Sequence, residues 1–346
     1  MTRELDAESD LPSRILFTRL RSLGDTVLMT PIFSVMKRVP GWQVGVVIEA
    51  PYEQILESNP DVDHLFVVDN QPNKWMARLQ VLRKIRAFQP AVAVDLHGGT
   101  TSALLTALSG ASRRVGFLKS RNSYLYNVRV PDCQQVWGRK QVHTVEHQLS
   151  VLKHLDFPVE PIPPPQVPVD SDDRASIEKM LADEGVERDF ILIHPAAAFD
   201  TKQWDAEKFA SLANRLVEDN HQVVMTAGPG EASLLEAVQQ DCDSKVRFLS
   251  PLPIRKFSAL CSFCSLYVGN DTGSTHIVAA LGKKIVVVWG SSDFKVWYPW
   301  GTDHELIRSD LPCMPCPGYF CLHFDEPRCI RSISVEPVLK AVQTLL

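Results

Sequence analysis

The chain has 346 residues, and at ~150 residues per domain this length predicts two domains. Hydrophobic residues make up 45% and charged residues 22%, which excludes a largely disordered chain, a coiled coil and a collagen-like rod. No apolar run reaches the ~18–20 residues that span a bilayer, and the polar, acidic first 13 residues contain no signal core. Eight unevenly spaced cysteines do not suggest a disulfide framework. We therefore expect a cytoplasmic protein.

The formal net charge of −5 is divided unevenly along the chain. Residues 1–165 carry 19 Lys/Arg and 16 Asp/Glu, a net charge of +3, whereas residues 166–346 carry 17 and 25, a net charge of −8. A slightly basic first half suits an anionic partner, although chance variation of surface charge explains the asymmetry equally well. The sequence contains no block of basic residues that would indicate nucleic acid.

Short apolar runs alternate with helical patterns through the first half. Strands are predicted at residues 14–20, 44–48, 64–68 and 91–96, and helices at 26–38, 51–57, 73–88 and 101–108. In the helix over 73–88, we expect Trp75, Leu79, Leu82 and Ile85 to form the buried stripe. Alternation of strands and helices builds a parallel sheet that is covered on both faces.

A proline-rich segment separates the two halves. Six prolines within residues 158–168 predict a stiff, extended linker, because proline continues neither a helix nor a central strand. The second half repeats the first half's alternation of strands and helices. Its predicted strands are 190–193, 222–226, 265–268 and 284–289, and its predicted helices are 171–184, 205–219 (capped by Asp205), 231–240, 273–281 and 335–346. Two such α/β halves place a ligand in the cleft between them, at the carboxyl ends of the strands.

The loop after the first strand contains Leu23, Gly24 and Asp25. Gly24 allows a tight turn or the close approach of a ligand. Asp25 is either the N-cap of the next helix or a general base aimed into the cleft, and its position along the chain is compatible with both. The dinucleotide-binding pattern G-x-G-x-x-G is absent, which disfavours a dehydrogenase.

Two loops of the second half combine a strand end with a helix start. In residues 194–204, Lys202 is either a solvated lysine or a ligand of phosphate. Residues 268–276 contain Asp271, Thr272, Gly273 and His276. Their small and polar side chains suit a ligand, as does the start of the helix predicted from residue 273. A capped helix with a hydrogen-bonded histidine is the structural alternative.

Two further patterns have ordinary structural explanations. Glu231 follows a Gly-Pro-Gly turn and is either a ligand of a ribose or a helix-start glutamate. Four cysteines lie within seventeen residues, at Cys313, Cys316, Cys321 and Cys329, but a second C-x2-C pair is missing. We therefore expect free or partly buried thiols and no obligatory metal there. Cys261 and Cys264 are predicted to be core residues.

The order of these motifs along the chain resembles that in the heptosyltransferases of bacterial lipopolysaccharide synthesis, which form glycosyltransferase family 9. The resemblance extends over roughly residues 14–345. The matching residues are Leu23, Gly24, Asp25, Thr30, Pro31, Asp95, Leu96, His143, Thr144, Val145, Glu146, Lys202, Trp204, Gly269, Asn270, Asp271, Gly273, His276, Gly290, Trp297, Pro299, Trp300 and Gly301. The resemblance implies the GT-B fold, in which two Rossmann-like domains with parallel sheets face each other across a cleft. The acceptor-side domain would be 1–165, the nucleotide-sugar domain 166–334, and the helix over 335–346 would pack back on the first domain.

The family's activity is an inverting transfer of heptose from ADP-heptose to the lipopolysaccharide inner core. Carried over by motif, Asp25 would deprotonate the acceptor hydroxyl. Lys202 and the amides around Thr272 and Gly273 would hold the diphosphate, Asp271 and His276 would contact the donor sugar or its phosphate, and Glu231 would hold the ribose. The scheme needs no obligatory cofactor, because Lys202 and the helix start supply the charge, and it is compatible with stimulation by magnesium.

The acceptor that the resemblance implies is a lipid-anchored saccharide. We therefore expect the protein to visit the anionic inner face of the inner membrane without entering it, and we expect no nucleic-acid partner. Basic residues of the first half that suit acceptor phosphates or anionic headgroups are Arg78, Arg83, Lys84, Arg86, Arg113, Arg114, Lys119 and Arg121.

The chain departs from the family pattern near the expected diphosphate site. Ala197 and Ala198 stand where several members have hydroxyl residues, Ser274 stands where proline is frequent, and Thr275 stands where methionine is usual. Two alternatives follow from these departures. One is a GT-B glycosyltransferase with another nucleotide sugar or acceptor, and the other is a non-catalytic protein that binds a nucleotide sugar.

Overall fold

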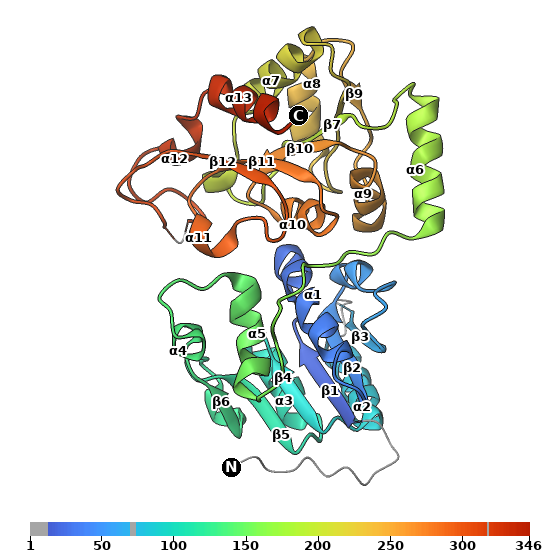
Figure 1. Ribbon diagram of the computed structural model, residues 1–346, viewed down its shortest axis with the longest axis vertical. Coiled ribbons are helices and arrows are strands. Elements are labelled where there is room, and N and C mark those ends of the chain that lie inside the picture. The colour runs from blue at the N-terminus through green and yellow to red at the C-terminus, as the bar shows by residue number, and fades with distance from the viewer. Residues whose placement is uncertain (1–12, 70–73, 317) are drawn as a thin grey trace. The chain divides into compact units, whose positions relative to one another are not determined.

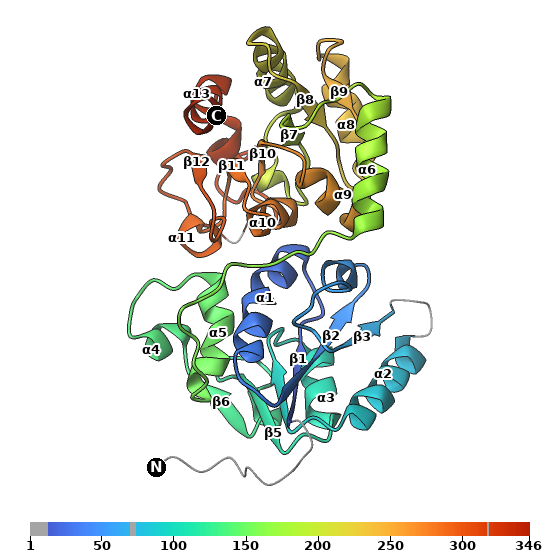
Figure 2. The ribbon, with the colours of Figure 1, turned by 45° about the vertical axis from the view of Figure 1, so that its right-hand side comes forward.

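The computed structural model describes residues 13–69, 74–316 and 318–346, and describes residues 74 and 75 by their backbone only. The acidic N-terminus and the Trp75 side chain of the predicted stripe lie outside the described residues. The chain forms two compact units, one containing β1 and Met29–Pro163 and the other containing Leu23–Leu28 and Pro164–Leu346. Each unit is a parallel sheet between layers of helices (Figures 1 and 2).

The sheet of the first unit has six strands in the order β3-β2-β1-β4-β5-β6, all parallel. This order is that of the dinucleotide-binding fold. The strands buried deepest are rich in Val and Ile, because a central parallel strand is covered on both faces. The strands are β1 (Ser13–Thr18), β2 (Trp42–Glu49), β3 (His64–Val68), β4 (Val92–Asp95), β5 (Arg113–Phe117) and β6 (Val128–Val130).

Helices cover the two faces of this sheet. Phe17 packs against Phe33 of α1 (Leu23–Lys37), and Phe117 stacks on His147 of α5 (Thr144–His154), so α1 and α5 share one face. Leu16 points to the opposite face, into a cluster with residues of α2 (Lys74–Phe88) and α3 (Thr100–Leu108). Shorter elements are the 3₁₀ turns η1 (Tyr52–Ile55) and η2 (Ser123–Leu125) and the helix α4 (Cys133–Trp137).

The stripe predicted for α2 is confirmed at Leu82 and Ile85 and is wrong at Leu79. Val81, Ile85 and Phe88 are the buried residues of this helix, and Leu82 packs at the edge of the same cluster. Leu79 is 50% exposed. Both stripes have helical spacing, so the sequence does not distinguish them. Packing on Leu16 and Phe66 of the sheet selects the stripe that contains Val81 and leaves Leu79 facing outward.

The sheet of the second unit repeats the strand order of the first. Its order is β12-β11-β10-β7-β8-β9, again parallel throughout. All eight predicted strands occur in the two sheets, and the structure adds β5, β6, β9 and β12. The strands of the second sheet are β7 (Ile191–His194), β8 (Val223–Met225), β9 (Arg247–Phe248), β10 (Leu266–Asn270), β11 (Lys284–Trp289) and β12 (His304–Arg308).

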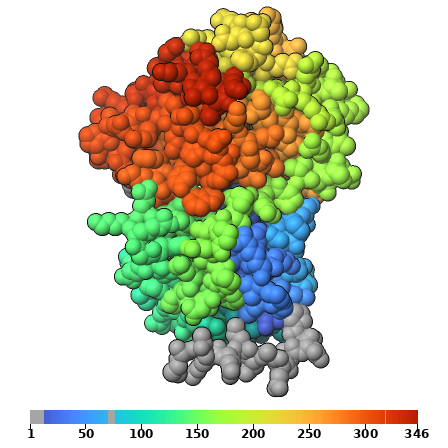
Figure 3. Space-filling model, viewed as in Figure 1, coloured from blue at the N-terminus to red at the C-terminus, as the bar shows by residue number. Residues whose placement is uncertain are grey.

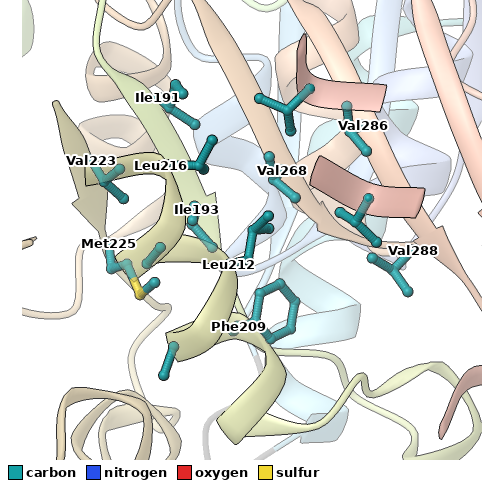
Figure 4. Packing of buried hydrophobic residues seen from close by; sticks show 14 of the residues in the cluster. Ile191, Ile193, Phe209, Leu212, Leu216, Val223, Met225, Val268, Val286 and Val288 are labelled. Atoms are coloured by element: carbon teal, nitrogen blue, oxygen red, sulfur yellow. The ribbon is translucent and has the colours of Figure 1, made fainter. Parts of the chain in front are cut away.

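The core of the second unit forms where alternate strand residues meet a layer of helices. Ile193, Val268 and Val288 point to the same side and pack against Phe209 and Leu212 (Figure 4). The helices on this side are α7 (Ala206–Glu218), α8 (Ala232–Gln240) and α13 (Val335–Leu345). The remaining helices are α6 (Ser171–Asp183), α9 (Ile254–Cys261), α10 (Gly273–Ala280), α11 (Phe294–Trp297) and α12 (Arg328–Arg331), with a 3₁₀ turn η3 (Asp200–Lys202). Cys261 and Cys264 are fully buried, which confirms their prediction as core residues.

The final helix packs within the second unit, and its predicted packing on the first domain stays a prediction. Val338, Leu339 and Val342 of α13 belong to the core of the second unit, beside α7, β11 and β12. Figure 3 shows the dark red residues of this helix among the yellow and orange residues of the same unit. The physical reason is that α13 covers apolar strand residues, among them Val286 and Val288, that would otherwise face water.

The α/β class and the two Rossmann-like domains with parallel sheets are confirmed. The proline-rich segment is neither helix nor strand and runs to Asp170, which caps α6 by accepting hydrogen bonds from the amides of Asp172 and Asp173. Among the helices that the structure describes, none is long and apolar enough to cross a membrane.

A buried carboxylate ties the end of β4 to α3 and to the segment before β6. Asp95 is almost fully buried and accepts hydrogen bonds from the hydroxyls of Ser102 (2.9 Å) and Tyr126 (2.7 Å). The amides of His97 and Gly98 also donate to it, at 2.8 and 2.9 Å. A carboxylate at this depth requires such donors, because it has left water.

We predict that Tyr126→Phe lowers the free energy of unfolding by ~1–3 kcal/mol, because it removes a charge-assisted donor from Asp95. Tyr124→Phe is the matched control, since Tyr124 is strongly exposed. The measurement is urea denaturation followed by circular dichroism. Equal stability of the two variants would contradict the importance of this hydrogen bond.

Candidate active site

The strand order of each sheet creates a point from which neighbouring connections run in opposite directions. In the second sheet this switch point lies between β7 and β10, which pair directly. Ligands of open parallel sheets bind at the carboxyl ends of the strands beside such a point. The loop that follows His194, the last residue of β7, contains Lys202, and the loop after β10 contains Asp271. The topology therefore brings two predicted motifs to one place.

Lys202 and Asp271 form an ion pair at this switch point. The Lys202 Nζ lies 2.6 Å from Asp271 Oδ2, and the Ser292 hydroxyl donates to the same oxygen. The Asp271 side chain is only 4% exposed, whereas that of Lys202 is 22% exposed. An ammonium group has three donors, so Lys202 can hold Asp271 and still donate toward a ligand on its open side. Asp271 thus orients the lysine and balances its charge.

The start of α10 lies directly after Asp271. Thr272 occupies the N-cap position with extended backbone, and its side chain makes no capping hydrogen bond. The Thr272 hydroxyl instead lies 2.6 Å from that of Ser274, to which Tyr267 also donates. Helix-start amides that no side chain caps, together with the positive end of the helix dipole, suit an anionic ligand. His276 lies in the first turn, where burial lowers its pKa.

Glu231 is paired with protein groups at the end of β8. Its Oε2 accepts a hydrogen bond from the Gly228 amide at 2.7 Å and lies 3.6 Å from His194 Nε2. The His194 ring packs edge-on against Phe257 and is buried. Burial lowers the pKa of His194, and the nearby Glu231 opposes this shift. One Glu231 oxygen is thus occupied, which leaves the other for the hydroxyls of a ligand.

The side-chain amides of Asn270 and Gln203 organise these loops, and no role was predicted for either residue. The Asn270 side chain donates to the Pro195 carbonyl at 2.8 Å and accepts from the Trp204 amide at 3.2 Å. The Gln203 side chain donates to Pro195 and accepts from the Ala197 amide at 2.7 Å. Asn270 is itself one of the matching motif residues, and Gln203 lies between two of them; these positions are the only signal in the sequence.

The turn that carries Lys202 is held from behind by another loop. A β-carbon at Gly290 would collide with the Thr201 carbonyl, so only glycine fits there. The buried Thr201 hydroxyl donates to the Gly318 carbonyl and accepts from the Ser291 hydroxyl at 3.0 Å. These contacts explain why Gly290 belongs to the motif set, because they fix the turn on which Lys202 stands.

Asp25 follows the switch point of the first sheet, within the stretch Leu23–Leu28 that belongs to the second compact unit. Helix α1 follows β1, which pairs with both β2 and β4 at the switch point of the first sheet. The helix begins at Leu23, so Asp25 stands in its first turn and is not the N-cap. The capping alternative is therefore wrong. The Asp25 side chain is partly exposed at the carboxyl edge of the sheet.

The basic residues proposed for the acceptor side do not gather at one edge. Arg113 and Arg114 stand at the amino end of β5, opposite the edge where ligands of such sheets bind. Lys119 and Arg121 follow the carboxyl end of β5, and Lys119 pairs with Asp132 at 2.6 Å. On α2, Arg78 is half-buried and Arg83 is exposed.

The four cysteines of the C-terminal tail lie close enough to influence one another. Burial, followed by the neighbouring Cys316, Cys313 and Cys321, raises the pKa of Cys329 to about 11. Within the described ranges, no three His, Cys, Asp or Glu side chains are arranged to hold a metal ion. That the tail needs no obligatory metal stays a prediction.

Two Rossmann-like sheets, with a lysine, a buried aspartate and an uncapped helix start at the second switch point, are the layout of a GT-B glycosyltransferase. The model of glycosyltransferase family 9 (heptosyltransferase) matches residues 78–323. The chain belongs to this family, as the motifs predicted.

Known relatives agree with this assignment. The chain is 24% identical over 294 residues to lipopolysaccharide heptosyltransferase 3 of Escherichia coli K12, covering 81% of this chain and 83% of that protein. A family 9 glycosyltransferase from Veillonella parvula superposes with a TM-score of 0.84 at 22% identity, covering 97% and 98% of the two chains. E. coli heptosyltransferase WaaC, solved with ADP-2-deoxy-2-fluoro heptose, gives a TM-score of 0.72 at 18% identity, covering 96% and 100%.

We predict that stability depends on pH through His194. An unfolded histidine takes up a proton near pH 6.5, whereas burial holds the pKa of native His194 below that value. Stability is therefore retained above about pH 6.5 and falls toward pH 5, by up to ~1.4 kcal/mol per pH unit for this group. His276, whose pKa is also lowered, acts in the same direction.

The variant His194→Gln should flatten this pH dependence, as measured by urea denaturation between about pH 5 and 8. His323→Gln is the control, because His323 is exposed. Identical slopes for both variants would show that His194 does not cause the loss of stability.

Proposed function

We propose that this protein transfers heptose from ADP-heptose to a lipopolysaccharide inner-core acceptor, with inversion at the anomeric carbon. The observation that carries the proposal is the Lys202–Asp271 pair beside the uncapped start of α10. Family membership and the heptosyltransferase relatives support the choice of donor. The reaction forms a bond between the acceptor oxygen and the anomeric carbon and breaks the bond from that carbon to the departing ADP.

In this proposal, the second domain binds the donor. Lys202 and the amides at Thr272 and Gly273 hold the diphosphate and stabilise the charge that grows on the departing ADP. Asp271 keeps Lys202 in place, a role that its burial and its 2.6 Å contact with the lysine support. His276 lies in the first turn of α10, beside the amides of Thr272 and Gly273 in the sequence. Glu231 uses its remaining oxygen for the ribose hydroxyls. The scheme needs no obligatory metal, because Lys202 and the helix start supply the positive charge.

In the same scheme, Asp25 is the general base on the acceptor side. A hydroxyl is a poor nucleophile at neutral pH, so a carboxylate within hydrogen-bond reach is needed to take its proton. The position of Asp25 beside the switch point of the first sheet supports this role. Because the acceptor is lipid-anchored, the protein would work at the inner face of the membrane, through transient contact with anionic headgroups.

We predict that Asp25→Asn lowers turnover by ~10²–10⁴-fold, since asparagine keeps the shape of the side chain but does not accept the proton. Loss of a negative charge from the first turn of α1 costs only ~0.3–1 kcal/mol of stability. Asp172→Asn makes the same change in the first turn of α6 and should leave turnover unchanged. Turnover and melting temperature are measured for both variants, and a folded Asp25→Asn protein within a few-fold of the parent would exclude Asp25 as the base.

We predict that Lys202→Ala weakens ADP-heptose binding by about 10- to 100-fold and also lowers turnover, because a charged hydrogen bond to phosphate is lost. Lys208→Ala is the matched control. Lys208 pairs with Asp205 on α7 and is similarly exposed, so its loss should leave donor affinity unchanged. Isothermal titration and steady-state kinetics give the two quantities, and equal donor affinity in the two variants would refute the assignment.

A further inference from the structure

Two helices of the first unit expose large apolar side chains on their outer faces. Met76 is 59% and Leu79 is 50% exposed on α2, and Leu104 is 42% and Leu108 is 46% exposed on α3. A helix on the surface of a soluble domain ordinarily turns its polar side outward. These helices already bury an apolar stripe against the sheet, so their exposed residues are additional to the core.

The two helices make one continuous surface. They cover the same face of the sheet and share a core cluster that includes Ile85 and Leu105. The Arg86 Nε donates to the Leu108 carbonyl at 2.8 Å, which joins the end of α2 to the end of α3. Both ribbon views show the helices side by side (Figures 1 and 2). We call this the α2–α3 surface and define it by Met76, Leu79, Arg83, Lys84, Arg86, Leu104 and Leu108.

The charge of this surface is opposite to that of the chain as a whole. Helix α2 contains five basic residues and no acidic residue, and α3 contains no charged residue. The whole chain has a net charge of −5. Met76, Leu79, Arg83 and Arg86 follow one another at intervals of three and four residues, so apolar and basic side chains share one outward stripe. A basic helix with exposed apolar residues suits a membrane interface.

We propose that the α2–α3 surface binds the anionic headgroup layer of a membrane, with Met76, Leu79, Leu104 and Leu108 entering the boundary of the acyl chains. The choice of a membrane rests on the proposed function, in which the acceptor is anchored in lipid. A second copy of the chain suits this surface poorly, because a two-fold contact would bring its cationic residues together. The exposed residues Tyr319, Phe320 and Leu322 of the C-terminal tail suit an anionic surface less well, because Asp325 and Glu326 follow them.

The test measures co-sedimentation of the full chain with phosphatidylcholine vesicles that contain or lack phosphatidylglycerol. The parent should bind the anionic vesicles, and more weakly as salt concentration rises. The double variant Arg83→Gln, Lys84→Gln should bind about 10- to 30-fold more weakly, because each basic residue near the surface contributes about a fivefold factor. Leu79→Ser should bind about fivefold more weakly, because it loses apolar burial.

Two controls make the surface assignment specific. Leu322→Ser removes a similarly exposed leucine from the C-terminal tail and should leave vesicle binding within twofold of the parent. Lys179→Gln with Arg188→Gln removes two exposed charges from the second unit and should also leave binding unchanged. Melting temperature and ADP-heptose binding verify that each variant is folded.

The proposal is overturned if the α2 variants bind anionic vesicles as the parent does, or if only Leu322→Ser abolishes binding. It is also overturned if the α2 variants only convert a dimer into a monomer in sedimentation velocity. Turnover on a delipidated, water-soluble acceptor separates this proposal from the proposed function. The Leu79→Ser variant, which changes no residue proposed for the acceptor, should keep that turnover. A parent that binds vesicles through α2 but transfers no heptose would contradict the proposed function alone.

Discussion

The ion pair between Lys202 and Asp271 is the interaction around which the candidate site of the second unit is organised. A carboxylate buried as deeply as Asp271 needs a compensating cation and hydrogen-bond donors, and Lys202 and Ser292 provide them. The pair in turn requires that two loops, separated by about seventy residues in the chain, end at the same place. Asn270 and Gln203 hold the backbone of these loops, while Gly290 and Thr201 fix the turn that carries the lysine.

Parallel strand pairing brings these loops together. β7 and β10 are neighbours in register, with Gly269 opposite His194, so the residues that follow both strands emerge at one edge of the sheet. The same strand order recurs in the first unit, where the switch point between β1 and β4 is followed by Asp25 on one side and by the buried Asp95 on the other. Polar residues thus follow the same topological position in both sheets, although the two sheets have different sequences.

Much of the architecture was predictable because central parallel strands are nearly continuous apolar runs. β3 and β11 were predicted with their observed bounds, and the other predicted strands differ from the observed ones by only a few residues. The missed strands β5, β6, β9 and β12 are very short or contain charged residues, since strands nearer a sheet edge are only partly covered. The missed helix α5 has one local signal, a capping box in which His143 and Glu146 bond each other's backbone amides.

The sequence by itself determined the alternation of strands and helices, the proline-rich linker and the motifs of a family 9 glycosyltransferase, because these depend on local patterns of apolar and polar residues. Only the tertiary structure decided which of two equally periodic stripes on α2 is buried, and where α13 packs. It also decided that Lys202 meets Asp271 and that Asp25 lies in the first turn of α1 and not at its N-cap position. The reason is physical: helical periodicity defines a face but not its partner, and a contact between distant residues depends on strand order, which no local pattern records.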